Sequence, residues 1–597
     1  MLPDIYYKER LEKLKESLKA LREKKSALGW VRFFMIVTII LSVYFLWPYG
    51  IGYVIAIAAI LFIGFVKIVF IDIDNNAAID HTNHLIKINE DESEALQHSY
   101  YHFAEGKQYI DNEHLYANDL DILGRASLFQ YINRTNSEMG EQTLVKWLLH
   151  PADITTIQER QNAVKELTSQ TEWRQEVQAI GKETKIALTT RERLQIWFSQ
   201  PNLFINSNWW KWLRFLLPAI IMSVVILYFF DEISLQILIS FLLVFFWIAY
   251  YFAKKVKPLH DQLSMMVSEL DVLSSSIRLF ERTIFYAPYL EEIQQNYRTG
   301  NNKASSELKE LKNILDRLDL SYNLVLTGPL NVLLLWNLQQ AIALEKWKER
   351  NKENAKNWFN ALGLMEALCS FSTASFNHPE WCFPDLKDEP FFMQGKEIGH
   401  PLINKIKRVN NDIEINKAAE LMLITGSNMA GKSTYLRSIG INVVLAMAGA
   451  PVCAENLILS PVQIISSMRI ADNLEESTST FYAELKKLKI IIDKVNNGER
   501  VFILLDEILR GTNSFDRHTG SVAFIKQLIK HNASGIIATH DIELAKMKET
   551  FPENILNYHF DVQVSNGELY FDYKLRDGIC TSMNASILMK KIGIEIN

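Results

Sequence analysis

Hydrophobic positions in this chain gather in four long runs that are arranged in two pairs. The runs occupy residues 30–47 and 51–70, then residues 209–230 and 233–253. Each run is close to the length of about 20 residues that an α-helix needs to cross a bilayer. The members of each pair are separated by only a short turn. The pattern predicts four transmembrane helices in two hairpins, and helices buried inside a soluble protein are the alternative.

Basic residues lie on one side of both predicted hairpins. Lysines and arginines are frequent in residues 1–28, and Lys254, Lys255 and Lys257 follow the second hairpin directly, whereas neither turn contains any. Because basic residues are retained on the cytoplasmic side, we expect both hairpins to point outward. The predicted location is the inner (cytoplasmic) membrane, with several passes, lipid contact and all soluble parts in the cytoplasm.

The polar parts of the chain carry helical periodicity first and an α/β pattern afterwards. The predicted segments are residues 1–28 (a cytoplasmic amphipathic helix), 29–71 (a transmembrane hairpin), 72–205 (a helical core), 206–253 (a second transmembrane hairpin), 254–395 (a helical lever and core region) and 396–597 (a C-terminal α/β domain). The leucines of the first segment have heptad-like spacing, so that helix either pairs with another helix or rests on a surface.

The region between the second hairpin and the α/β domain predicts long antiparallel arms. Residues 305–320 and 333–352 have helical periodicity with mixed charge. Interruptions are expected at residues 299–302 and at Gly328-Pro329, where glycine, asparagine and proline are concentrated.

The clearest chemical signal is a glycine-rich turn that follows the apolar residues 421–424. The turn has the spacing G-x-x-x-x-G-K-[ST] and opens a helical pattern, which is typical of a P-loop. Gly426 and Gly431 let backbone N–H groups face phosphate oxygens. Lys432 is expected to reach the β- and γ-phosphates, and the Ser433 hydroxyl to bind Mg²⁺. The predicted nucleotide-binding residues are Gly426, Ser427, Asn428, Met429, Ala430, Gly431, Lys432, Ser433 and Thr434.

Two acidic residues and a histidine follow later apolar strands. Residues 501–505 form an apolar run that ends in Asp506-Glu507, and the run 535–539 ends at His540. About eighty residues after a P-loop, this is a Walker B pattern. Asp506 would hold Mg²⁺ through water, and Glu507 would activate the attacking water. His540 would contact the γ-phosphate. The predicted catalytic residues are therefore Glu507, His540 and Lys432, with ATP and Mg²⁺ as cofactors.

Composition adds little to this interpretation. The chain has 63 basic and 69 acidic residues, a balance that neither indicates nor excludes nucleic-acid binding. Its four cysteines lack the spacing of a disulfide framework or a zinc site. The histidine pairs at 81/84 and 98/102 are interpreted as solvated, and the basic residues at 346–356 as one face of a solvent-exposed helix.

Four motifs in order resemble one family. They read GSNMAGKSTYLR, STFYAE, LLDEILRGTNSFD and ATH, and they are similar to the ATPase domain of the MutS family. The similarity runs from Gly399 to about Ile594, and a weaker similarity to the family's core covers residues 123–168 and 365–375. Leu509 and Ala430 stand where the family usually or often has glycine, but neither change removes a catalytic group.

The resemblance implies a homodimer through the ATPase domains, with each nucleotide completed by the partner. It implies that Ser479, with Thr480, faces the γ-phosphate bound by the other subunit. From the residues alone, the hydroxyl cluster at 477–480 is either an anion site or an ordinary helix cap. It also implies that Asn428 is the family's P-loop asparagine and that DNA is a ligand. We expect the family's N-terminal mismatch-reading domain to be absent, because membrane spans occupy its place.

These expectations combine into one prediction. The chain is expected to be a membrane-anchored ATPase of the MutS type, with an α/β P-loop domain C-terminal to an all-α core and lever region. It would hydrolyse ATP to ADP and phosphate at composite dimer sites and bind DNA in mismatch repair or recombination. The alternative is an ATP-driven membrane machine that uses the same motor without DNA as a ligand.

Overall fold

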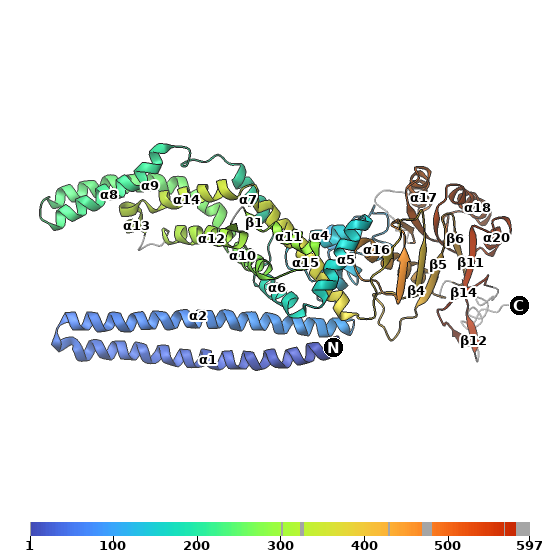
Figure 1. Ribbon diagram of the computed structural model, residues 1–597, viewed down its shortest axis with the longest axis horizontal. Helices are drawn as coiled ribbons and strands as arrows, with labels where there is room; N and C mark the ends of the chain where they lie inside the picture. Colours follow the sequence, from blue (N-terminus) through green and yellow to red (C-terminus); the bar gives the residue numbers. More distant parts are fainter. Residues whose placement is uncertain are drawn as a thin grey trace.

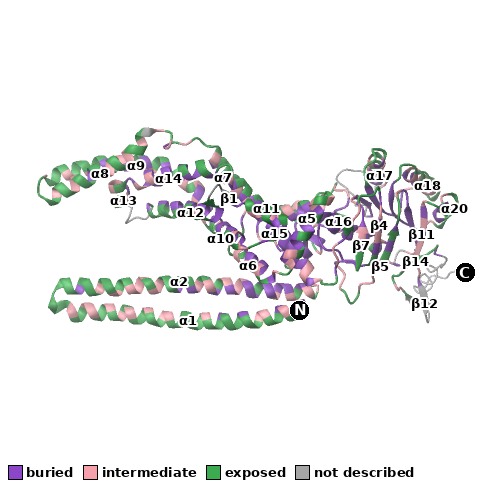
Figure 2. Cartoon of the chain, in the orientation of Figure 1, coloured by how far each residue is buried: buried purple, intermediate pink, exposed green. Residues whose placement is uncertain are grey.

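The computed structural model describes residues 2–299, 302–322, 327–427, 430–468, 480–565 and 568–580. The molecule is elongated, with two helical hairpins toward one end and a sheet domain at the other (Figure 1). Buried residues are concentrated in the sheet domain and in the helical layers between the two ends, whereas the hairpin tips are largely exposed (Figure 2).

The first hairpin consists of α1 (Pro3–Leu46) and α2 (Ile51–Leu96), joined by the 3-10 turn η1 (Trp47–Tyr49). Each helix is continuous, so the domain boundaries predicted at residues 28/29 and 71/72 fall inside helices. Leu14 and Leu18 of α1 pack with Ile86 of α2 and its neighbours. The heptad-like leucines therefore pair with the second helix of the same chain, which decides between the two alternatives for residues 1–28.

The second hairpin consists of α8 (Asn208–Phe229) and α9 (Leu235–Ser264). Its tip lies at the same end of the molecule as the tip of the first hairpin (Figure 1). α1, α2, α8 and α9 are all long and apolar enough to cross a membrane. Two hairpins that project toward one end are consistent with insertion into one bilayer from one side.

A helical core connects the hairpins to the sheet domain. Its elements are η2 (Lys107–Tyr109), α3 (Leu128–Ile132), α4 (Glu138–Leu149), α5 (Ile154–Thr168), α6 (Thr171–Glu183), α7 (Leu188–Ser199), α11 (Pro288–Gln295) and α15 (Ala355–Asn377). α15 is buried along most of its length and packs against α4 and α5. It is therefore the central helix of the core.

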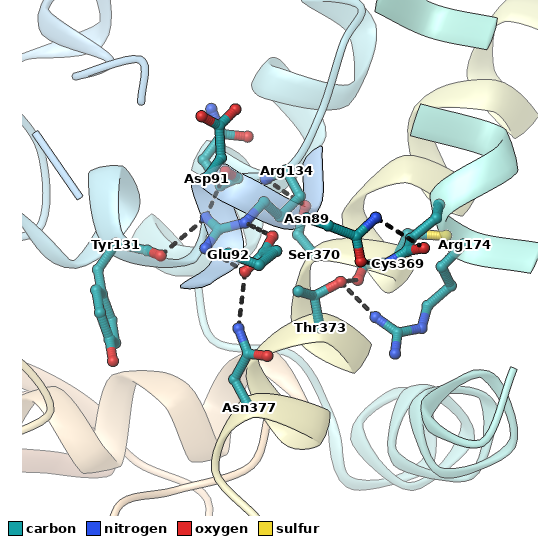
Figure 3. A network of polar contacts seen from close by, with 12 residues as sticks. Asn89, Asp91, Glu92, Tyr131, Arg134, Arg174, Cys369, Ser370, Thr373 and Asn377 are labelled. Carbon is teal, nitrogen blue, oxygen red and sulfur yellow. Dashed lines mark hydrogen bonds and ion pairs between the residues drawn. The ribbon is translucent and has the colours of Figure 1, made fainter. Parts of the chain in front are cut away.

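A buried polar network fastens the first hairpin to α15 (Figure 3). The Glu92 carboxylate of α2 pairs with the Arg134 guanidinium, and both side chains are almost fully buried. The Asn377 amide donates to Glu92 Oε2 over 2.8 Å, and the Tyr7 hydroxyl donates to Asn377 Oδ1 over 2.7 Å. The backbone N–H of Arg134 donates to the Ser370 hydroxyl over 3.0 Å. Both helices of the hairpin are thus joined to one core helix.

The arm contains α10 (Val267–Arg282), α12 (Ala304–Leu320), α13 (Thr327–Leu334) and α14 (Trp336–Asn351). The interruption expected at residues 299–302 is confirmed, because β1 (Arg298–Thr299) and β2 (Asn302–Lys303) are strands that pair antiparallel. The helix predicted over residues 333–352 is confirmed as α14 but begins three residues later, because Leu335 has a left-handed backbone with φ 47° and separates α13 from α14. Gly328-Pro329 begins α13 rather than interrupting it, since proline is tolerated in a first helical turn.

The C-terminal region is built on two sheets. The larger has the order β14-β11-β6-β10-β9-β8 and is parallel except for β14. Its strands are β6 (Leu421–Thr425), β8 (Gln463–Ser467), β9 (Val501–Asp506), β10 (Ser534–Thr539), β11 (Ile555–Phe560) and β14 (Leu575–Asp577). The smaller sheet contains β3 (Asp385–Leu386), β7 (Asn456–Leu459), β4 (Met393–Ile398) and β5 (Asn411–Ile415). A separate hairpin pairs β12 (Gln563–Ser565) with β13 (Glu568–Tyr570).

Helices cover both faces of the larger sheet. They are α16 (Lys432–Ala448), α17 (Thr480–Asn496), α18 (Ser514–Lys530) and the short α19 (Ile542–Ala545) and α20 (Met547–Thr550). Alternate residues of each strand point to opposite faces. Met422 and Ile424 join the core that contains α16, whereas Leu421 and Leu423 join the core formed with α17 and α18. Because both faces are covered, the central strands β6, β9 and β10 are buried along their whole length.

Candidate functional site

The chemistry-bearing residues meet at one edge of the larger sheet. β10 lies between β6 and β9, and the three strands are parallel and in register, with Thr539 opposite Thr425 and Ala538 opposite Asp506. Their carboxyl ends therefore coincide. The glycine-rich loop, the Asp506-Glu507 pair and His540 all leave the sheet at this edge.

The glycine-rich loop needs glycine at both ends. Gly426 has φ 143° and Gly431 has φ 105°, values that side chains rarely allow. A Cβ at position 426 would also lie 2.8 Å from the Phe560 carbonyl oxygen. Gly431 is followed directly by α16, so the loop delivers the chain into a helix N-terminus. Asn428 and Met429 lie outside the described residues.

Lys432 is folded back over this loop. Its Nζ donates to the carbonyl oxygens of Gly426 over 2.6 Å and Ser427 over 3.0 Å, and it lies 3.4 Å from His540 Nε2. Burial lowers the pKa of Lys432 to about 8. An ammonium group in such a place gains most from an anion that would compensate for the loss of water.

Two oxygen donors face each other beside the lysine. The Ser433 hydroxyl donates to Asp506 Oδ2 over 2.5 Å, and Asp506 is buried. A hydroxyl and a carboxylate are the hard oxygen ligands that Mg²⁺ prefers. The donor set therefore fits Mg²⁺, with Ser433 and Asp506 as its protein contacts.

Glu507 stands next to this pair and is held by His540 and Arg510. Its Oε1 lies 2.8 Å from His540 Nε2, and its Oε2 lies 3.1 Å from Arg510 Nε. The hydrogen bond from His540 is the main reason why the pKa of Glu507 is lowered. Glu507 is thus a carboxylate at neutral pH and can accept a hydrogen bond from water.

Arg510 and Glu484 belong to the site but were not predicted. The Arg510 guanidinium donates to the Asp506 carbonyl. The Glu484 carboxylate accepts the backbone N–H groups of Leu509 over 2.5 Å and of Arg510 over 3.0 Å. Glu484 is the glutamate of the STFYAE motif, and that motif is the feature of the sequence that could have marked it as a site residue. It positions the turn that carries Arg510.

A cavity of about 310 Å³ opens beside the glycine-rich loop. Gly431 and Ser433 line it on the loop side, and residues 398–411 form the opposite wall. The Tyr573 ring, which lies 3.0 Å from where a Gly431 Cβ would be, closes one end. Burial lowers the pKa of the lining residue His400 to about 4, so this imidazole is neutral.

The remaining predicted positions are placed less directly. Ala430 is buried in the loop and Thr434 is exposed on α16. Ser479 lies outside the described residues, as does the side chain of Thr480, so the structure does not place the hydroxyl cluster.

Most of the basic residues at 346–356 are exposed, as predicted for one face of a solvent-exposed helix, and Arg350 forms a surface ion pair with Glu310 over 2.7 Å. Lys348 is the exception, because it is buried and donates to the Gln200 carbonyl. The histidine pairs are not simply solvated, contrary to prediction: His81 Nε2 lies 2.7 Å from Glu176, and burial lowers the pKa of His98.

Comparison with known proteins identifies two regions of the chain. A family model of MutS domain V matches residues 422–592, and one of MutS domain III matches residues 111–194. The DNA mismatch repair protein MutS of Lactobacillus helveticus is 30% identical over 226 residues, which are 37% of this chain and 26% of that protein. The human MutS protein homolog 4 is 31% identical over 235 residues, which are 38% of this chain and 24% of that protein.

The chain is a member of the MutS family. It spans about a quarter of the length of these relatives, since 26% and 24% of them are covered. The match to MutS domain V includes the positions of the loop lysine, the serine–aspartate pair and the glutamate–histidine pair described above. The α/β region with the candidate site is therefore one of the two parts of the chain that match MutS family models.

Proposed function

We propose that this MutS family member binds ATP with Mg²⁺ and hydrolyses it to ADP and phosphate. The observation that carries the proposal is the convergence of Lys432, the Ser433–Asp506 pair and the Glu507–His540 pair at one sheet edge. A cation, two hard oxygen ligands and a carboxylate are the groups that phosphoryl transfer to water requires.

Each residue would have one task. Lys432 would exchange its two carbonyl contacts for phosphate oxygens, whose charge it neutralises. Ser433 and Asp506 would hold Mg²⁺, which supplies charge neutralisation at the phosphates. Glu507 would orient a water and accept its proton, while His540 and Arg510 keep the Glu507 carboxylate in place. The backbone N–H groups after Gly426 would bind the phosphates.

The cavity beside the loop is the proposed site for the purine base and ribose. It adjoins Gly431 and Ser433, so a nucleotide with its phosphates on the loop would place its base there. The exposed part of the Tyr573 ring offers a surface for stacking. We propose that Tyr573 contacts the base.

The ATPase domains are proposed to form a homodimer. The support is the family resemblance, in which Ser479 and Thr480 reach the nucleotide of the other subunit. If hydrolysis per subunit stayed constant on dilution through the monomer–dimer transition, the composite site would be wrong.

Both hairpins are proposed to span the cytoplasmic membrane, with the sheet domain in the cytoplasm. The support is the length and apolar composition of the four helices and the common direction of the two tips (Figure 1). The Arg32–Asp72 ion pair, 2.9 Å long, lies where the apolar part of the first hairpin meets its polar part. It would lie where the membrane meets the cytoplasm.

The network at the base of α2 is the proposed connection between nucleotide and membrane. Arg134 donates to the Tyr131 carbonyl, and the Tyr131 hydroxyl lies 2.6 Å from His378 Nε2. Burial lowers the pKa of His98, two residues beyond α2, and the charges of His378 and Arg408 lower it further. Arg408 lines the cavity beside the glycine-rich loop. A shift of the cavity wall that contains Arg408 would therefore act on α2, a continuous helix that reaches the tip of the first hairpin.

Two functions are candidates for this ATPase. The match to MutS domains III and V favours DNA, as in mismatch repair or recombination. The second candidate is a membrane machine without DNA, and it is favoured by Lys348 of the arm, which is buried and donates to the Gln200 carbonyl. Phosphate contacts need accessible basic groups, so Lys348 offers none.

Steady-state ATP hydrolysis in lipid nanodiscs tests the proposal. Lys432→Ala is expected to abolish nucleotide binding, and Glu507→Gln to keep binding while stopping turnover. The exposed Lys530→Ala on α18 is the matched control and should behave as wild type. Equal turnover in Glu507→Gln and wild type would remove Glu507 from catalysis.

Parallel reactions with no DNA, perfect duplex, mismatched duplex and branched DNA, at one stated salt concentration, separate the two candidates. Stimulation by one DNA form supports DNA as the ligand. Lys432-dependent hydrolysis that no DNA form changes supports the membrane machine.

A further inference from the structure

The basic residues of α1 change in their partners along the helix. Two of those toward the core are paired, Arg10 with Glu172 over 3.2 Å and Lys15 with Glu90 over 3.2 Å. Nearer to the apolar run, four exposed basic residues form no ion pair with any residue that the structure describes: Lys19, Arg22, Lys24 and Lys25. The charge of this part of α1 is therefore not neutralised within the described chain.

Two of these four residues, Lys19 and Arg22, line a groove between α1 and α2. The groove has a volume of about 560 Å³. Its lining also includes Leu18 of α1 and Ile86 of α2, which are buried where the two helices pack together. α1 lies at the edge of the molecule (Figure 1), so the groove has an apolar floor and a basic wall that faces outward.

Hydrogen-bond donors lie in the same groove. The Ser26 hydroxyl of α1 and the Asn83 amide of α2 line it, and neither side chain bonds to another described residue. Glu23 is the acidic residue in the lining, so one carboxylate faces two unpaired cations. Guanidinium, ammonium, hydroxyl and amide groups are the donors that bind phosphate oxygens. The groove is therefore suited to an anion that carries phosphate.

The position of the groove along α1 indicates where such an anion would come from. The apolar run begins at Trp30, which is 62% exposed, and tryptophan is typical of the membrane–water interface. Ser26 precedes Trp30 by four residues and Arg22 by eight, or about 6 Å and about 12 Å along the helix. Lipid headgroups occupy about 5–8 Å on each side of the hydrocarbon. Ser26 would thus lie among the headgroups, and Arg22 within one Debye length of about 8 Å from them.

We propose that this groove binds the phosphate-bearing headgroup of an anionic phospholipid from the cytoplasmic leaflet. Lys19 and Arg22 would bind the phosphate oxygens, and Ser26 would donate a hydrogen bond to the headgroup. The acyl chains would lie along exposed apolar residues of α1 such as Phe33, which is 55% exposed. The inference rests on the proposed membrane span of α1–α2. A lipid bound between the two helices would make the hairpin that is joined to α15 sensitive to membrane composition.

Calorimetric titration of the full-length protein in a non-ionic detergent tests the site. The probes are dihexanoyl phosphatidylglycerol, dihexanoyl phosphatidylcholine, inorganic phosphate and a short DNA duplex, at one stated salt concentration. The variant Lys19→Gln/Arg22→Gln removes both groove cations. Lys8→Gln/Lys13→Gln is the matched control, because it removes the same charge from exposed positions at the core end of α1. An unchanged urea midpoint shows that each variant is folded.

The expected result is that the protein binds phosphatidylglycerol at least about tenfold more tightly than phosphatidylcholine. Lys19→Gln/Arg22→Gln should lose this preference, and Lys8→Gln/Lys13→Gln should keep it. Equal affinity for the two lipids, or a preference that survives in Lys19→Gln/Arg22→Gln, overturns the site. Inorganic phosphate or DNA that binds as tightly as phosphatidylglycerol, and depends on the same two residues, assigns the groove to a soluble anion or to nucleic acid and also overturns it.

A separate measurement tests the hairpin on which the inference rests. Leu41→Cys places a fluorophore on the exposed face of the apolar run of α1, with the half-buried Cys382 changed to serine. In reconstituted vesicles, quenching by lipids with quenchers on their acyl chains supports the hairpin, and a failed titration then overturns the lipid site alone. Quenching at position 41 only by a quencher dissolved in water refutes the membrane hairpin, and the lipid site with it.

Discussion

Glu92→Gln is expected to weaken the attachment of the first hairpin to the core. In the wild type the Glu92 carboxylate contacts the Arg134 guanidinium and the Asn377 amide, and Arg134 also lies 3.7 Å from the centre of the Phe103 ring. Glutamine keeps the shape and one acceptor but removes the negative charge. Arg134 is then a buried cation without its counter-ion.

The burial of the pair sets the size of the effect. The side chains of Arg134 and Glu92 are 5% and 3% exposed, and removing one partner of such a pair costs about 3–5 kcal/mol. Two residues earlier on the same helix, Glu90 pairs with Lys15 over 3.2 Å, with side chains 41% and 58% exposed. Solvent screens this second pair, so Glu90→Gln is expected to cost about 0–1 kcal/mol.

Urea unfolding in nanodiscs, followed by tryptophan fluorescence, measures both variants under identical conditions. The double variant Glu92→Gln/Arg134→Met removes the stranded charge and is expected to recover most of the loss. The reasoning would be refuted if Glu92→Gln and Glu90→Gln lowered the unfolding midpoint equally.

Three further changes address the core and the site. Burial raises the pKa of Glu366 to about 7. The folded state therefore binds the Glu366 proton more tightly than the unfolded state does, and the free energy of unfolding should fall by about 3 kcal/mol as the pH rises from about 4.5 to 7. Glu366→Gln should flatten this pH dependence when the urea midpoint is measured at each pH. Tyr573→Ala should weaken nucleotide binding about tenfold in a titration, whereas the exposed Tyr570→Ala should not. Gly363→Ala would place a Cβ 2.9 Å from the Met139 carbonyl oxygen. It should lower stability by about 1–3 kcal/mol, and a gain would contradict the close α4–α15 packing.

Local patterns predicted the parts of the site that depend on neighbouring residues. The apolar run 501–505 lies within β9, and the glycine-rich turn leads from β6 into α16, as expected. These predictions succeeded because a buried strand followed by a special turn leaves its signal in adjacent positions. The same holds for the hairpins, whose apolar runs became four long helices.

Residues that act across the fold escaped such patterns. Tyr573 joins the site only through its contact with Gly431, which lies far away in the chain. Lys348 looked like one charge of a solvent-facing helix, but the chain before α8 packs over it. Leu335 interrupts a helical pattern with a left-handed backbone, and nothing in the neighbouring sequence marks that position.

The sequence by itself determined the order of hairpins, helical core and α/β domain, and the loop chemistry that points to a nucleotide. Periodicity, charge bias and turn residues are properties of short stretches, and they act before the chain has packed. Only the tertiary structure decided that α1 and α2 are unbroken to the core, that Glu92 meets Arg134 and Asn377, and that α13 packs against the second hairpin. These contacts join residues far apart in the chain, and their energy exists only when packing excludes water from both partners.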